Sequence, residues 1–221
     1  MSGLQKVIDS AQSIDFARAS LVATSVSRSG RLLTASRNWV KPWKFTVQPQ
    51  PTWSYDATTR GMIESIMTSD RHTEQVIQLG QTAGSTWVID YMGTHDNTSH
   101  ILNNITITSF VGTSMVIGFN TSNVANNTYV FRAGDVIQPT GHRYPYVVTS
   151  DVQKLSGNTS LTVTVNRGAI AETGYTFAGK TITVGTGICW YVKVSKLPGT
   201  RLVAGKFVEF TDSFEFLESV I

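Results

Sequence analysis

The chain has 221 residues, of which 41% are hydrophobic and only 15% charged, against a usual charged share of about 25%. A composition this rich in Ser, Thr and aromatic residues favours β-structure and excludes a coiled coil or a highly charged disordered tail. No apolar run approaches the roughly 18 residues of a membrane-spanning helix. The single cysteine, Cys189, excludes an internal disulfide or a cysteine zinc site and is expected in the core.

The net charge of +3 is unevenly distributed along the chain. Residues 16–55 hold basic residues and no acid, whereas residues 207–221 hold acids and no base. Three interpretations stay open: two solvated surfaces, a nucleic-acid patch, or a head-to-tail interface in which the basic segment of one copy meets the acidic segment of the next. The residues concerned are Arg18, Arg28, Arg31, Arg37, Lys41 and Lys44, and Glu209, Asp212, Glu215 and Glu218.

The first elements in chain order are a helix and a long hairpin. Helical spacing of apolar residues predicts an amphipathic helix over residues 3–13. Alternation then predicts strands over 20–28 and 31–39, joined by a two-residue turn at Ser29-Gly30. A hairpin with so many small and polar residues buries little and is marginal alone. It should therefore pair with another part of this chain or with a neighbour.

The next segment predicts a strand over 42–47, with Trp43, Phe45 and Val47 on one face, ended by the prolines of 48–51. A helix follows over Thr58–Ser69. Its buried stripe is expected to contain Met62, Ile63, Ile66 and Met67, which are core residues more often than cofactor ligands. Residues 74–79 and 85–92 predict a pair of strands.

The residue composition and the pattern of predicted strands change near residue 94. Residues 94–186 carry few charges and predict short strands at 105–110, 114–119, 128–132, 145–150, 160–166 and 175–184, which is typical of a small β-barrel or sandwich. Longer strands return over 188–196, 201–203, 206–211 and 213–218. We therefore expect a discontinuous β domain of residues 1–93 and 187–221 with an inserted β domain of residues 94–186, held by neighbouring strands 87–92 and 189–194.

Candidate catalytic groups are few. His95, Asp96 and His100 do not have metal-ligand spacing, and no nucleophile elbow, phosphate loop or dinucleotide fingerprint occurs. Asp135, Asp151 and Glu172 resemble turn acids. The five tryptophans could form a carbohydrate platform but are more often core or interface anchors. We therefore predict no enzyme, no cofactor and no catalytic, cofactor-binding or metal-binding residue.

Short sequence strings resemble baseplate and tail-tube-like proteins of contractile-tailed bacteriophages. The resemblance covers most of the chain and rests on short strings and general composition, not on a diagnostic motif. The strings lie at 26–37, 41–47, 60–66, 131–138, 144–149, 163–167 and 214–218. The family implies a tail-tube-like β-sandwich or barrel with one packed helix, here Thr58–Ser69. It also implies that hairpins, here Ser20–Trp39, join those of neighbours into a ring, usually six-fold, around a channel that passes DNA. The inserted domain departs from a plain tube subunit.

The resemblance implies a structural virion protein, made in the host cytoplasm, that initiates or caps the tail tube at the baseplate or acts as a hub adaptor. The implied partners are further copies of itself, the tail tube protein and baseplate hub or wedge proteins, with DNA only as passing cargo and no membrane. The predicted inter-subunit contacts are Arg28, Arg31, Arg37, Lys41, Trp43, Glu209, Asp212 and Glu215. The alternatives are a carbohydrate- or receptor-binding β module of a tail and, as an enzyme, a polysaccharide or peptidoglycan hydrolase.

Overall fold

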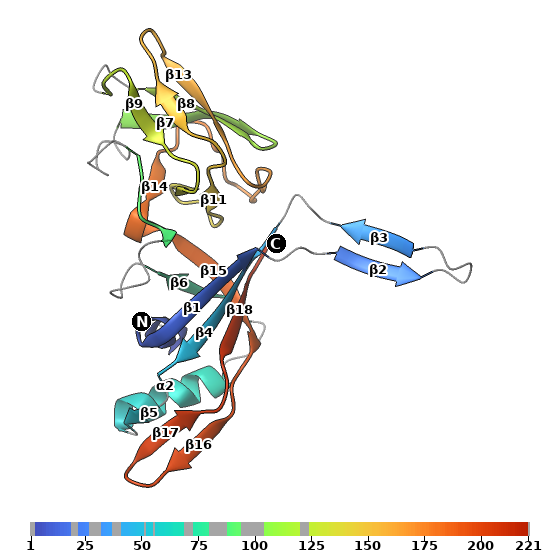
Figure 1. Cartoon of the computed structure of the whole chain (residues 1–221), viewed down its shortest axis with the longest axis vertical. Helices are drawn as coiled ribbons and strands as arrows, with labels where there is room; N and C mark the ends of the chain where they lie inside the picture. The colour runs from blue at the N-terminus through green and yellow to red at the C-terminus, as the bar shows by residue number, and fades with distance from the viewer. Residues whose placement is uncertain are drawn as a thin grey trace. The chain divides into compact units, whose positions relative to one another are not determined.

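The computed structural model describes residues 3–18, 22–26, 32–36, 41–50, 52–54, 56–68, 73–79, 88–93, 104–119 and 124–220. The fold is mainly β, which confirms the predicted class (Figure 1). The chain divides into a discontinuous unit, Met1–Ile77 with Tyr191–Ile221, and a continuous unit, Gln78–Trp190. The division drawn from sequence lies at 93/94 and 186/187 instead. Among the described helices, none is long and apolar enough to cross a membrane.

The discontinuous unit is built on a curled five-stranded sheet. Its order is β1 (Ala11–Arg18), β4 (Trp43–Pro49), β18 (Phe214–Glu218), β15 (Cys189–Lys196) and β6 (Gln75–Gln78). Trp43, Phe45 and Val47 alternate on the buried face of β4, as the sequence predicts. β4 continues through Pro49, beyond the predicted end. β15 lies beside β6, whereas residues 88–92, the described part of the predicted strand 85–92, form no strand.

Two helices belong to this unit. α1 (Gly3–Asp9) packs against α2 (Ala57–Thr68) and β4, and Leu4, Val7 and Ile8 are buried. The predicted helix over 3–13 is thus too long, because residues from Ala11 onward pair with β4 as strand β1. α2 matches the predicted helix within one residue at each end, and Ile66 of its expected stripe is buried.

A second sheet of this unit has the order β16 (Thr200–Val203), β17 (Phe207–Phe210) and β5 (Thr52–Ser54). The turn between β16 and β17 contains Gly205 and Lys206, with φ of +92° and +66°. Glycine tolerates this left-handed region, which explains the sharp reversal at the Ala204-Gly205 turn that the sequence predicts. All four residues of β16 are exposed, so this edge strand contributes little to the core.

A separate two-stranded ribbon consists of β2 (Val22–Val26) and β3 (Leu32–Ser36) (Figure 1). The strands are antiparallel, with Val22 opposite Ser36 and Val26 opposite Leu32. The predicted two-residue turn would place Val26 opposite Leu33, so the observed register differs from it by one residue. The connecting residues 27–31 lie outside the described part of the chain.

The described residues of the continuous unit form three small sheets. The first has the order β13 (Ser160–Thr164), β8 (Ser114–Phe119) and β7 (Ile105–Val111). The second pairs β12 (Val152–Lys154) with β9 (Thr128–Phe131). The third has the order β11 (Tyr146–Val147), β10 (Val136–Pro139) and β14 (Ile182–Val184). A 3-10 turn, Gly185–Gly187, follows β14. The sequence missed β10 and β12, and of its predicted strand 175–184 only residues 182–184 form one.

Residues 166–180 form a long segment without helix or strand, here called the strap. It begins after the bridge between Val148 and Val165 and ends before the bridge between Thr106 and Thr181. Loops longer than about 12–15 residues are uncommon inside compact domains and are often functional. Because the strap has no helix or strand, other contacts must hold it in place.

Candidate assembly surface

The ribbon begins and ends at the sheet of the discontinuous unit. Arg18, the last residue of β1, lies opposite Trp43, the first residue of β4. In the sequence the ribbon thus lies between the two paired strands β1 and β4. The arrangement fixes where the chain leaves and re-enters the sheet.

The edges of the ribbon have no strand partner within the described residues, because β2 and β3 pair only with each other. Proteins usually guard such edges with charged residues, proline or bulges. The sequences Val-Ala-Thr-Ser-Val and Leu-Leu-Thr-Ala-Ser contain no charge and no proline, and the two strands pair without a register shift. The ribbon therefore has the composition of a strand pair that another strand covers.

Trp43 is one of the predicted contact residues, and it is a core residue of its own chain, 4% exposed. Its ring stacks on Phe45, with centroids 6.3 Å apart, and the Arg18 guanidinium lies 5.5 Å from its centroid. The Trp43 backbone N–H donates to Oε2 of Glu218 over 3.0 Å. Glu218 is 3% exposed, so this carboxylate, absent from the predicted contacts, fixes the first residue of β4.

The predicted acidic contacts all have a basic partner within the chain. Lys44 Nζ lies 2.8 Å from Glu215 Oε2, Asp212 pairs with Lys196 and Glu209 with Arg201. The hydrogen bond from Lys196, aided by the Ser213 N–H, lowers the pKa of Asp212 below its usual value. Lys44 and Glu215 bring the basic and acidic segments of the sequence together inside one molecule. Exposed pairs of this kind contribute only about 0–1 kcal/mol.

The predicted basic contacts are mostly outside the described residues. Arg28, Arg31 and Arg37 fall in the ranges 27–31 and 37–40, which the structure does not describe. Lys41 is exposed, with a φ of +40°. That left-handed conformation is unusual for a lysine and marks the point where the chain returns from the ribbon to β4. Contact of these residues with a neighbour stays a prediction.

The groups considered for catalysis have structural partners where the structure describes them. Asp135 accepts from the N–H groups of Met92 and Arg132, each over 2.8 Å, and burial raises the pKa of its carboxyl. Asp151 accepts from the Ala133 N–H over 2.9 Å, and this bond, with Arg132, lowers its pKa. Both are turn acids, as the sequence predicts.

Cys189 is half-buried rather than fully enclosed. Its N–H and C=O both bind the side-chain amide of Gln138, each over 3.0 Å. Burial raises the pKa of the thiol, which keeps it protonated and weakly nucleophilic at neutral pH. Within the described residues no group of three His, Cys, Asp or Glu could hold a metal ion, and His95, Asp96 and His100 lie outside them.

Two of the five tryptophans have described side chains, and both are buried. Trp43 is 4% and Trp190 0% exposed. Neither indole face is available to a sugar, so these two residues have the core role that the sequence favours. The side chains of Trp39, Trp53 and Trp87 lie outside the described part of the structure.

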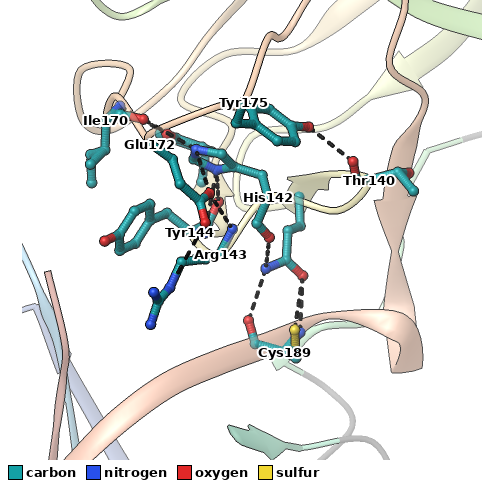
Figure 2. Close-up of polar contacts among 10 residues, drawn as sticks. Thr140, His142, Arg143, Tyr144, Ile170, Glu172, Tyr175 and Cys189 are labelled. Atoms are coloured by element: carbon teal, nitrogen blue, oxygen red, sulfur yellow. Dashed lines mark hydrogen bonds and ion pairs between the residues drawn. The ribbon is translucent and has the colours of Figure 1, made fainter. Parts of the chain in front are cut away.

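A polar cluster around His142 is the feature of the continuous unit that sequence reasoning missed (Figure 2). His142 Nε2 lies 3.1 Å from the Ile170 carbonyl, to which it donates, and Nδ1 accepts from the Tyr144 N–H over 3.3 Å. Glu172 Oε2 lies 3.7 Å from Nε2 and accepts from the Arg143 N–H over 3.3 Å. The density of aromatic residues at 144, 146, 175 and 177 is the only signal in the sequence that points to this cluster.

Scans against protein-family models and searches of curated proteins find no match for this chain. The function is therefore argued from the residues and geometry described above.

Proposed function

We propose that the protein is a structural subunit that assembles with copies of itself through the ribbon, as a ring at the baseplate end of a contractile phage tail. The observation that carries self-assembly is the pairing of β2 and β3 with each other and with no other described strand. The resemblance of the sequence to tail-tube-like proteins supports the placement in a tail. The ring initiates or caps the tube and encloses the DNA channel.

Strand geometry explains why identical copies suit this ribbon. In a ring every ribbon has the same orientation, so β3 of one copy would lie antiparallel to β2 of the next. Each contact is heterologous, and a closed ring satisfies every edge without leaving a free end. A two-stranded ribbon that is marginal alone thereby becomes part of a continuous sheet. The number of copies, six, comes from the resemblance alone.

In this proposal the β1–β4 pair and the arginines next to the ribbon in the sequence have separate roles. The start of β4 is fixed within the chain by Trp43, Glu218 and the β1–β4 pairing. The arginines at 28, 31 and 37 flank the strands and are proposed to meet acidic groups of an adjoining subunit. A channel that passes DNA should not bind phosphates tightly, because each neutralised phosphate adds salt-dependent affinity.

The proposal is tested by the oligomeric state of the full chain. Light scattering should give the mass of a multimer, and electron micrographs should show rings. Val26→Lys puts a charge into β2 and should reduce the multimer to a folded monomer, because charged residues protect strand edges from pairing. The matched control is Val111→Lys, since Val111 ends strand β7 and is already 76% exposed; it should leave the rings intact.

Two outcomes would overturn the proposal. One is a wild-type chain that stays monomeric at every concentration reached, both alone and with tail tube protein. The other is a Val26→Lys protein that assembles as well as the Val111→Lys control. Circular dichroism on each variant separates lost assembly from lost folding.

A further inference from the structure

The strap is held at its two ends by backbone hydrogen bonds. At one end the Ala169 N–H donates to the Gly112 carbonyl over 2.8 Å. At the other, the Gly179 N–H donates to the Ile107 carbonyl over 2.8 Å, and the Ile107 N–H to the Lys180 carbonyl over 2.7 Å. These bonds tie both ends to β7 and to the turn that follows it. Residues 170–177 lie between these two attachments.

The middle of the strap is joined to β11 and to the turn between β10 and β11, residues 140–145, by hydrogen bonds that use side chains from both sides. The Tyr175 hydroxyl donates to the Thr140 carbonyl over 2.9 Å, and the Ile170 N–H donates to the Tyr146 hydroxyl over 3.1 Å. His142 reaches the Ile170 carbonyl, and Glu172 the Arg143 N–H, as Figure 2 shows. One imidazole therefore bridges the turn and the strap.

The His142 side chain is completely buried, with 0% of its surface exposed. Aromatic rings enclose it: Tyr175 and Phe177 of the strap have centroids 4.7 Å and 4.9 Å away. The ring centroids of Tyr144 and Tyr146 are 5.3 Å and 5.9 Å away. A neutral imidazole suits this enclosure because one ring nitrogen donates to a carbonyl and the other accepts from an N–H.

We propose that His142 is an acid-sensitive latch: the neutral imidazole holds residues 170–177 against the β10–β11 turn, and its protonation releases them. An imidazolium would place a second N–H at Nδ1, against the N–H of Tyr144. It would also bury a positive charge in an aromatic enclosure, which is costly without full compensation. Movement of the ring into water removes that cost and breaks its bond to Ile170.

Charged and titratable neighbours act in both directions on this equilibrium. The Glu172 carboxylate favours the imidazolium, and the Tyr144 carbonyl, 3.3 Å from Nδ1, could accept its new proton. Arg167, buried between Tyr144 and Tyr146, opposes a second positive charge. Arg143 lies beside Glu172 and partly neutralises it. Burial is the largest of these effects and lowers the pKa of His142 below 6.5.

The direction of the pH response follows from burial being the largest of these effects on the pKa of His142. In the closed form the pKa of the imidazole lies below 6.5, whereas in the released strap it regains an ordinary pKa. Release is therefore favoured as the pH falls from 6.5 through the lowered pKa of His142. It would uncover the rings of Phe110, Tyr146 and Phe177, which pack on one another with centroids about 5 Å apart in the closed form.

Hydrogen exchange on the full chain tests the latch. Between pH 7.5 and pH 5.0, after correction for the intrinsic rate, protection of peptides covering 168–178 should fall, by a factor set by the difference between the pKa of His142 in the closed and released forms. Peptides covering β8 and β13 should keep their protection. His142→Gln should remove the pH dependence, because a glutamine amide can donate to the Ile170 carbonyl and accept from the Tyr144 N–H without titrating. Glu172→Gln removes a charge that favours the imidazolium in the closed form, so it should lower the pKa of His142 further and enlarge the loss of protection at pH 5.0.

Any of three results would overturn the latch: pH-independent protection of the strap in wild type, a fall that persists in His142→Gln, or an equal fall in β8 and β13, which would mean global unfolding. If His142→Gln does not fold, the imidazole resonance of His142 in wild type decides. Its titration should have a midpoint below 6.5 that coincides with strap release, and a midpoint at or above 6.5 would contradict the proposal. The latch concerns one unit and is independent of ring assembly.

Discussion

The ribbon β2–β3 and the strap 166–180 are both segments outside the larger sheets of their units, and their hydrogen bonds differ. The strap obtains its partners inside the continuous unit, from β7, Tyr146, His142 and the turn at 140–145. The ribbon obtains from the described residues only the bonds between its own two strands. The strap is thus held within its own unit, whereas the partner proposed for the ribbon is a neighbouring copy of the chain.

The strongest way to break this comparison is to reverse the charge at the tip of the ribbon. Arg28→Glu with Arg31→Glu should abolish assembly while the monomer stays folded, because like charges facing each other across an interface cost several kcal/mol. Light scattering gives the mass, and circular dichroism the fold. Lys193→Glu with Lys206→Glu makes the same change in net charge at exposed positions and should leave assembly unaffected. Intact rings in the arginine variant would show that these residues meet no acidic partner.

On the side of the strap, Arg167→Ala should cause the largest loss of stability. Arg167 is 1% exposed, and Nη2 donates to the Pro145 carbonyl over 2.6 Å. Its guanidinium also lies 5.3 Å from the Tyr146 ring centroid. Removal leaves a cavity and a buried carbonyl without this donor, so the free energy of unfolding should fall by about 3–5 kcal/mol.

Arg167→Met is the informative companion variant. It keeps most of the buried volume without the charge, and well-packed apolar replacements of buried charges are often close to neutral. Urea denaturation followed by tyrosine fluorescence measures both. Equal losses for Ala and Met would indicate that the guanidinium, and not the packing, holds the strap and the β11 segment together.

At the start of β4, Glu218→Ala should have an intermediate effect. The variant removes the carboxylate that accepts the buried Trp43 N–H, and leaving such a donor unsatisfied costs about 1–3 kcal/mol. Glu218→Gln retains an acceptor and should lose less. Urea denaturation at neutral pH compares the two. An alanine variant as stable as wild type would show that Trp43 anchors the start of β4 by packing alone.

Local patterning predicts the elements whose burial alternates or repeats along one face. β4 and α2 follow from Trp43, Phe45, Val47 and the apolar residues of 62–67, and β7 and β8 from their alternation. β1 does not follow, because the spacing from Leu4 to Ala11 suits a helix until pairing with β4 takes precedence. Local patterning does not predict the His142 cluster either, because the fold and not the sequence spacing brings residues 142 and 170 together.

The smallest expected effect concerns Lys44 and Glu215, where the basic and acidic segments meet. They lie on the neighbouring strands β4 and β18, with side chains 40% and 26% exposed. A double-mutant cycle with Lys44→Ala and Glu215→Ala should give a coupling of about 0.2–1 kcal/mol in the monomer. If Glu215 binds a basic group of the next subunit on assembly, Glu215→Ala should weaken ring formation more than Lys44→Ala does. Equal effects of the two variants on assembly would place this pair wholly within one chain, and the charge asymmetry of the sequence would then have an intramolecular role at this position.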